Sequence, residues 1–96
     1  MKIVLVGLNH KAAPVEVRER LAFTDAELPS ALKALSEYVV EGAILSTCNR
    51  TEAYAVANLS SAGAEVLKRF LSEYHDVPVG QFEPYLYVYS GQDAIR

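Results

Sequence analysis

Short apolar runs along the chain alternate between the spacing of strands and the spacing of helices. Residues 2–8, KIVLVGL, form a nearly unbroken apolar run rich in β-branched side chains, which predicts a central strand covered on at least one face. Residues 43–46 and 52–57 predict two more strands, with the loop 47–50 between them. The alternating tyrosines of residues 85–89 predict a last strand.

Two helices are predicted between the first strand and the second. Pro14 can open a short helix through PVEVRERL, in which Glu16 and Arg20 are spaced to pair along one face. The longer helix begins with a capping box, TDAE at 24–27, and continues through apolar residues at helical spacing, which are Leu28, Ala31, Leu32, Leu35 and Val39. Because Pro29 lies about one turn inside that start, the regular helix is expected to begin near Pro29 rather than in the capping box.

The predicted elements combine into an α+β fold. Gly42 is expected to end the longer helix, and a further helix is predicted with Ser60 or Ser61 as its cap and one face lined by Val66, Leu67, Phe70, Leu71 and Tyr74. The element order becomes βαββαβ, which gives the ferredoxin-like split fold. We therefore expect an antiparallel sheet with helices packed on one face and the middle two strands adjacent or nearly so.

Length and composition fit one domain over residues 1–96. Hydrophobic types make up 51% of the chain, enough for one compact core. The 9 basic and 12 acidic side chains give a net charge of -3, so an RNA partner would bind locally or through other parts of the protein. No apolar run approaches the ~20 residues of a membrane span, and the N-terminus lacks a signal-peptide pattern. A soluble cytoplasmic protein is expected.

A redox cofactor would need another domain. The five glycines form neither GxGxxG nor a phosphate loop, so the chain shows no dinucleotide cradle. Residues 91–96 read as the first turn of a further helix without a stop signal. We expect the intact protein to continue beyond Arg96.

Cys48 is the first candidate for chemistry. As the single cysteine, it can form neither an internal disulfide nor a cysteine zinc cluster, so its thiol is either inert packing or reactive. A thiol attacks as thiolate, and a nearby cation promotes its ionisation. Arg50 lies two residues further on and could lie near Cys48 or hold an anionic substrate beside it. Ser46, Thr47 and Asn49 surround the thiol with hydrogen-bonding groups.

Other residues have competing interpretations. His10 follows the first strand and could act as a general base, although a loop histidine is more often solvated or hydrogen-bonded. His75 is explained by the helix dipole, because a protonated imidazole complements the negative end of a helix. The tyrosines at 85, 87 and 89 could stack bases, as in RNA-recognition folds. Alternation in a half-buried strand explains them equally well, and the signature of that family is absent.

Two sequence blocks resemble those of glutamyl-tRNA reductases. The first is Gly7-Leu8-Asn9-His10-Lys11, followed by Ala13-Pro14-Val15 and Arg18-Glu19-Arg20-Leu21. The second, Ser46-Thr47-Cys48-Asn49-Arg50-Thr51-Glu52, looks like the active-site segment of that family. With Asp93-Ala94, the resemblance covers essentially the whole chain and identifies it as an N-terminal catalytic domain.

The resemblance implies an activity and the roles of four residues. Members of this family reduce glutamyl-tRNA(Glu) to glutamate-1-semialdehyde with NADPH, the first committed step of tetrapyrrole synthesis by the five-carbon route. The residue matching Cys48 forms a glutamyl thioester and releases tRNA, and hydride then reduces the thioester. Residues matching Thr47, Asn49 and Arg50 contribute to the substrate site, with Arg50 pairing with the side-chain carboxylate.

Further parts are implied for the intact protein. They are a functionally important histidine just beyond Arg96, an NADPH-binding domain and a helical C-terminal domain that forms a homodimer. A hand-over of product to glutamate-1-semialdehyde aminomutase is also expected. We expect the 96-residue chain alone to fold without performing the NADPH-dependent reduction. The alternative is a noncatalytic ferredoxin-like module that binds a ligand or a partner.

Overall fold

Four strands and three α-helices make up the regular structure. The computed structural model describes residues 2–47, 49–57 and 60–91, with residues 60 and 61 described by their backbone alone. The strands are β1 (Lys2–Asn9), β2 (Gly42–Ser46), β3 (Arg50–Ala57) and β4 (Tyr87–Ser90). The α-helices are α1 (Val15–Leu21), α2 (Leu28–Leu35) and α3 (Ser60–His75), and two short 3₁₀ helices, η1 (Val79–Gln81) and η2 (Glu83–Tyr85), precede β4.

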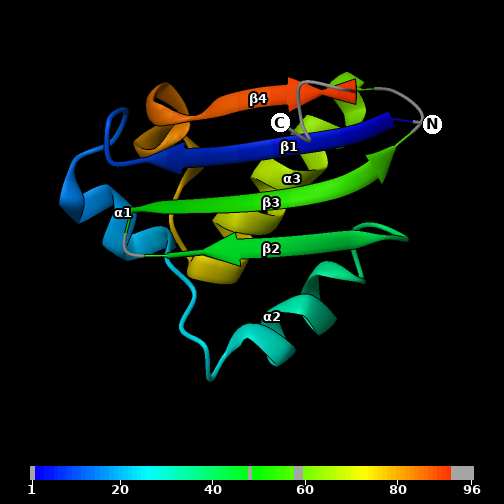
Figure 1. Ribbon diagram of the computed structural model, residues 1–96, viewed down its shortest axis with the longest axis horizontal. Helices are drawn as coiled ribbons and strands as arrows, with labels where there is room; N and C mark the ends of the chain where they lie inside the picture. Colours follow the sequence, from blue (N-terminus) through cyan, green and yellow to red (C-terminus); the bar gives the residue numbers. More distant parts are fainter. Residues whose placement is uncertain (1, 48, 58–59, 92–96) are drawn as a thin grey trace.

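The strands form one antiparallel sheet in the order β2-β3-β1-β4 (Figure 1). β1 is a central strand because it pairs with β3 on one side and β4 on the other. The middle two strands of the sequence, β2 and β3, are direct neighbours. The predicted α+β split fold, with its antiparallel sheet, is confirmed.

The hydrophobic core lies between one face of the sheet and the helices. Alternate residues of β1 and β3 point to this face, and each α-helix adds apolar side chains to the same cluster. Figure 1 shows α3 running across the back of the sheet, behind β1 and β3. Burying each larger side chain stabilises the fold by roughly 1.5–3 kcal/mol. The innermost members are Val4, Val6, Leu8, Leu21, Leu35, Leu67, Phe70, Leu71 and Phe82.

Helix α2 is shorter than predicted. Thr24 and Glu27 form the reciprocal bonds of a capping box, with Thr24 N donating to Glu27 Oε1 at 2.9 Å and Glu27 N to Thr24 Oγ1 at 3.2 Å. They shape the turn before α2, which begins at Leu28 beside Pro29 as expected. The helix ends at Leu35, well before Gly42. Leu32, one of the apolar residues at helical spacing, lies away from the core and is 42% exposed.

The last strand also begins later than predicted. Tyr85 lies in η2 and packs against the core, and β4 starts at Tyr87. The expected row of three tyrosines on one strand face is therefore reduced to Tyr87 and Tyr89, whose ring centroids lie 5.4 Å apart. The shift arises because Pro84 falls inside a 3₁₀ turn and restricts the backbone before the strand.

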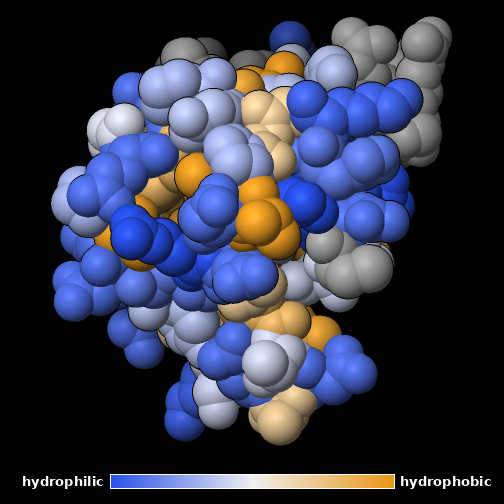
Figure 2. Space-filling model, turned by 90° about the vertical axis from the view of Figure 1, so that its left-hand side faces the viewer, coloured by the Kyte–Doolittle hydropathy of each residue, from blue (hydrophilic) through white to orange (hydrophobic). Residues whose placement is uncertain are grey.

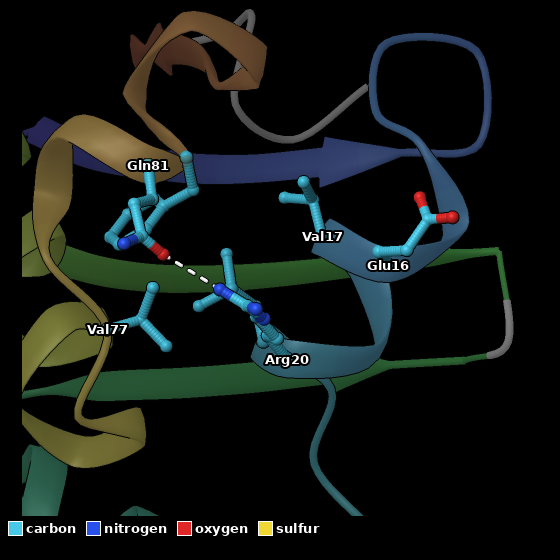
Figure 3. Close-up of a pocket in the computed structure, with 7 residues that line it drawn as sticks. Glu16, Val17, Arg20, Val77 and Gln81 are labelled. Carbon is cyan, nitrogen blue, oxygen red and sulfur yellow. Dashed lines mark hydrogen bonds between the residues drawn. The ribbon is translucent and has the colours of Figure 1, made fainter.

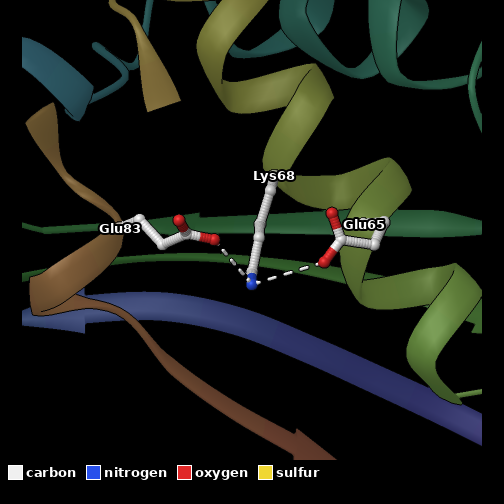
Figure 4. A network of polar contacts seen from close by, with 3 residues as sticks. All are labelled: Glu65, Lys68 and Glu83. Atoms are coloured by element: carbon white, nitrogen blue, oxygen red, sulfur yellow. Dashed lines mark hydrogen bonds and ion pairs between the residues drawn. The ribbon is translucent and has the colours of Figure 1, made fainter. Parts of the chain in front are cut away.

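A lysine of α3 anchors the segment that leads into β4. Lys68 Nζ lies 3.2 Å from Glu83 Oε2 in η2 and 3.6 Å from Glu65 Oε1 one turn earlier in α3 (Figure 4). Glu83 opens the 3₁₀ turn three residues before Leu86, so this pair helps to fix where β4 meets the sheet. The ion pairs are partly exposed and each contributes no more than about 1 kcal/mol.

His75 ends α3 in a setting different from the one expected. Its ring packs 4.6 Å from the Phe23 ring and 5.1 Å from the Tyr74 ring, measured between centroids. Its Nε2 atom is buried without a hydrogen-bond partner among the described residues. Burial lowers the pKa of His75 below its usual 6.5, outweighing the Glu27 carboxylate and a backbone hydrogen bond to Leu21, which raise it. The expectation of a protonated imidazole stabilised by the helix dipole is therefore wrong.

Across residues 2–47, 49–57 and 60–91, no helix combines the length and the apolar character that crossing a membrane demands.

The folded protein should lose stability as the pH falls through the range in which His75 titrates. Between the lowered pKa of the folded state and 6.5, the unfolded chain binds a proton that the folded chain does not. His75→Gln lacks this titration. The stability advantage of the unsubstituted chain over His75→Gln, measured by urea unfolding, should therefore be smaller at about pH 5 than at about pH 7.5. An equal advantage at both pH values would contradict the lowered pKa.

Candidate active site

The two sequence blocks that carry candidate chemistry meet at one end of the sheet. In the β1–β3 pairing, Asn9 lies opposite Arg50 and Leu8 opposite Thr51. The turn after β1 and the loop between β2 and β3 therefore lie side by side, next to the start of α1 (Figure 1). Figure 2 shows this end of the molecule, where hydrophilic side chains surround a small group of hydrophobic ones.

The loop between β2 and β3 is organised by Thr47. Its backbone N–H donates to Arg50 O at 2.8 Å, and its hydroxyl oxygen accepts from the backbone N–H groups of Asn49 and Arg50, each at 3.2 Å. These bonds occupy the lone pairs of the hydroxyl and leave its proton to donate. Thr47 and Asn49 are exposed, and their place in a substrate site stays a prediction. Cys48 lies outside the described residues, so its predicted proximity to Arg50 stays a prediction.

The base of this loop is tied to the segment after α1. Ser46 Oγ accepts from the backbone N–H of Phe23 at 2.9 Å and lies 3.3 Å from Thr51 Oγ1. Thr51 is only 3% exposed, so these polar contacts are shielded from water. They connect the sheet end to the chain that joins α1 and α2. Such contacts hold the loop in one position before any ligand binds.

The neighbouring turn is built by Asn9. Its side-chain Oδ1 accepts from the backbone N–H groups of Lys11 and Ala12, each at 3.0 Å, which forms an Asx turn. Its backbone oxygen accepts from Ala12 and Ala13. His10 is exposed in this turn, and its role as a general base stays a prediction.

On the sheet face opposite the core lies a polar cluster that sequence reasoning missed. Glu52 is only 6% exposed, and its two carboxylate oxygens accept from Tyr54 Oη at 2.7 Å and Tyr87 Oη at 2.6 Å. Gly7 lies directly opposite Glu52, and a Cβ there would sit 2.7 Å from Glu52 Cγ. Glycine at this position therefore makes room for the buried carboxylate. A glutamate in a strand with tyrosine two residues later was the available signal.

The tyrosines of this cluster stay protonated at neutral pH. Burial raises the pKa of Tyr54 to about 12, and the hydrogen bond to Glu52 adds to the increase. The same two causes, in the same order, raise the pKa of Tyr87. The positive charge of Arg50 lowers the pKa of both phenols, by less than burial and the Glu52 hydrogen bond raise it.

A cavity of about 320 Å³ opens between α1 and the segment 77–82. Val17, Leu21, Val77 and Phe82 give it apolar walls, and Arg20 Nη1 donates to Gln81 Oε1 at 2.8 Å across it (Figure 3). None of the predicted site residues Thr47, Asn49 and Arg50 lines this cavity. The cavity instead adjoins Arg20 and Leu21 of the first sequence block.

The described glycines do not form a dinucleotide site. A Cβ at Gly7, Gly42 or Gly63 would collide with protein atoms at 2.7 to 2.8 Å, so these glycines serve packing. Gly80 and Gly91 lie in open space, apart from any strand-to-helix turn. The described residues therefore do not fit the NADPH that the resemblance implies. Nor do they bring three His, Cys, Asp or Glu side chains together as metal ligands.

Known proteins match this chain over its whole length. The sequence family described as "Glutamyl-tRNAGlu reductase, N-terminal domain" matches residues 6–96. The glutamyl-tRNA reductase of Roseiflexus sp. (strain RS-1) is 52% identical over 96 residues, covering 100% of this chain and 23% of that protein. That of Syntrophotalea carbinolica is 44% identical over 98 residues, covering 100% of this chain and 22% of that protein. The chain thus spans less than a quarter of these curated relatives.

A solved structure supports the same relationship. The glutamyl-tRNA reductase from Methanopyrus kandleri matches with a TM-score of 0.55 and 26% identity. The match covers 97% of this chain and 20% of that chain.

Gly7→Ala should destabilise the fold by about 1–3 kcal/mol, because the added Cβ would collide with Glu52 Cγ and the backbone oxygen of Thr51, both at 2.7 Å. Gly80→Ala is the matched control, since no atom lies within 4 Å of its added Cβ. Urea unfolding followed by circular dichroism would compare the two variants. Equal unfolding free energies would show that Glu52 does not depend on the space above Gly7.

Proposed function

Because the chain belongs to the glutamyl-tRNA reductase family, matching its N-terminal domain, we propose that residues 1–96 form the catalytic domain of such an enzyme. The domain supplies the nucleophile and part of the glutamate site for converting glutamyl-tRNA(Glu) to glutamate-1-semialdehyde, the first step of tetrapyrrole biosynthesis. The observation that carries this proposal is the register that sets Asn9 opposite Arg50. Both family blocks thereby contribute to one end of the sheet.

Cys48 is the proposed nucleophile. Its thiolate attacks the ester carbonyl carbon of glutamyl-tRNA, and a C–S bond forms. The C–O bond to the tRNA ribose breaks, and the ribose oxygen takes a proton as the tRNA leaves. The product is a glutamyl thioester, which is more electrophilic than a free carboxylate and has a competent leaving group.

The reduction depends on a cofactor held elsewhere in the protein. NADPH would supply the hydride that converts the thioester carbonyl carbon to the aldehyde. Cys48 would leave the reduced acyl carbon as a thiolate, ready for another turnover. This chain's own contribution is to hold the acyl group while that reduction occurs.

Three residues around Cys48 are proposed to bind the glutamyl group. Arg50 pairs with the side-chain carboxylate, because its planar guanidinium can donate two parallel hydrogen bonds. Thr47 uses its hydroxyl proton as a donor, since its lone pairs are occupied by the turn. Asn49 adds an amide that can donate and accept. The anchored turn would present these groups in a fixed arrangement.

The proposal extends to the intact enzyme. We place it in the cytoplasm as a homodimer formed through a C-terminal domain, passing its reactive aldehyde to glutamate-1-semialdehyde aminomutase.

Cys48→Ser in the full-length enzyme should abolish the glutamyl thioester and reduce turnover by at least about 10³-fold, because a hydroxyl of similar volume is a much weaker nucleophile. The thioester is measured as radiolabelled glutamate that stays on the acid-precipitated protein and is released by hydroxylamine. Circular dichroism checks that the fold is retained. Unchanged turnover would favour the noncatalytic module. In that case, the rate of Cys48 alkylation, measured against pH, should indicate an ordinary or inaccessible thiol and not a reactive thiolate with a depressed pKa.

Arg50→Lys should raise KM for glutamyl-tRNA by about 10-fold, and Arg50→Gln by about 100-fold, because lysine keeps the charge without the two-pronged donor. Steady-state kinetics of the full-length enzyme would measure both. Arg69→Gln is the matched control: Arg69 lies on α3, with its guanidinium carbon 5.6 Å from the centre of the Tyr38 ring, away from the sheet end. If Arg50→Gln leaves KM unchanged, Arg50 does not bind the carboxylate.

A further inference from the structure

Glu52 is a buried carboxylate without a cationic partner. It is 6% exposed, and none of the ion pairs formed among the described residues includes it. A buried charge is costly unless its oxygens are hydrogen-bonded. Both oxygens here accept from phenols, one from Tyr54 in the same strand and one from Tyr87 in β4. The two tyrosines therefore satisfy and cover a charge that a cation would ordinarily neutralise.

Arg50 is the cation within reach of this carboxylate. Arg50 and Glu52 are two residues apart in β3, so their side chains leave the same face of the sheet roughly 7 Å apart. From this spacing, the side chain of an arginine is long enough for its guanidinium to reach the carboxylate and form a two-pronged ion pair. Arg50 is nevertheless exposed, and among the described residues it pairs with no carboxylate. The Arg50 guanidinium and the Glu52 carboxylate therefore stay unpaired with each other, although their spacing along β3 would allow an ion pair.

The arrangement of the tyrosines supplies the reason. Tyr54 and Tyr87 each direct a hydroxyl to a different oxygen of Glu52, so both oxygens of this 6% exposed residue have a hydrogen-bond donor. Gly7 leaves room for the Glu52 side chain opposite it, since a Cβ at position 7 would lie 2.7 Å from Glu52 Cγ. The same face of the sheet thus holds an anion that is hydrogen-bonded by two phenols and a cation that pairs with no carboxylate among the described residues.

We propose that Tyr54 and Tyr87 are positioning residues that occupy Glu52 and so keep the Arg50 guanidinium available for the side-chain carboxylate of the glutamyl substrate. This inference rests on the proposed function, in which Arg50 binds that carboxylate. It adds a specificity role for two tyrosines that do not touch the substrate themselves. Removing one hydroxyl leaves a Glu52 oxygen free to compete with the substrate for Arg50.

The test uses the full-length enzyme and single-oxygen deletions. Tyr87→Phe and Tyr54→Phe should each raise KM for glutamyl-tRNA roughly 3- to 10-fold with kcat nearly unchanged, because the lesion affects substrate binding. Tyr89→Phe is the matched control on the same strand, with a side chain that is 45% exposed. Adding Glu52→Gln to Tyr87→Phe should restore KM, since a neutral amide does not attract Arg50 strongly. A purely structural role predicts no such rescue.

A second measurement is independent of turnover. Phenylglyoxal modifies unpaired guanidinium groups, and peptide mass spectrometry can follow Arg50 separately, with Arg69 as an internal reference. Labelling of Arg50 should slow severalfold in Tyr87→Phe and recover in Tyr87→Phe/Glu52→Gln. Thermal unfolding of each variant checks that the protein is folded. If a double variant fails to fold, the labelling rate in Tyr87→Phe alone decides the question.

The outcomes separate this inference from the proposed function. If Arg50→Gln raises KM but neither tyrosine variant changes KM or Arg50 labelling, the positioning role is overturned and the proposed carboxylate site stands. If Arg50→Gln leaves KM unchanged, both fail together. An increase in KM that Glu52→Gln does not reverse would also overturn the positioning role.

Discussion

The antiparallel pairing of β1 with β3 is the constraint on which the rest of the structure depends. It places Asn9 opposite Arg50 and Gly7 opposite Glu52, joining segments that are far apart in the sequence. Side chains alternate along a strand, so a slip of one residue would turn Arg50 and Glu52 toward the core and expose Ala53. The buried residues on the core face of β1 and β3 oppose such a slip. The geometry of the candidate site is thus set by hydrophobic burial on the other side of the sheet.

Local patterns were sufficient to predict most of the fold. The apolar run of β1 and the helical spacing in α3 are enough to predict these two elements without knowledge of their tertiary contacts. The order of the elements then allows only a few fold topologies. The wrong predictions concern where α2 ends and where β4 begins. Helix α2 ends at Leu35, where the backbone changes to i→i+3 turns in which Glu37 N–H donates to Ala34 O and Tyr38 N–H to Leu35 O. No spacing rule anticipates those turns. Tyr85 left the predicted strand because η1 and η2 carry the chain past α3 before β4 begins.

Less of the candidate site than of the fold could be predicted from the sequence. Thr47, Asn49 and Arg50 were identified through a motif, and the structure adds the turn that Thr47 organises. The partnership of Glu52 with Tyr87 could not be predicted, because the two are 35 residues apart and meet only once β4 has paired with β1. Sequence alone shows a glutamate in a strand, which ordinarily indicates exposure. Its burial follows from Gly7, whose missing side chain is informative only when the register is known.

The charge distribution favours recognition of the amino acid over recognition of the RNA backbone. Binding to phosphates grows with the number of cations in contact, and in this chain the 9 basic side chains are outnumbered by 12 acidic ones. Under the proposed function, this domain would contribute little to the affinity for tRNA and would act on the aminoacyl end. Under that function, binding of the glutamyl group depends on Arg50 staying accessible to the substrate carboxylate. In such a site a neighbouring acid would compete with the substrate for the guanidinium. Hydrogen bonds from two phenols to Glu52 prevent this competition without adding a positive charge, which would attract phosphates without selectivity.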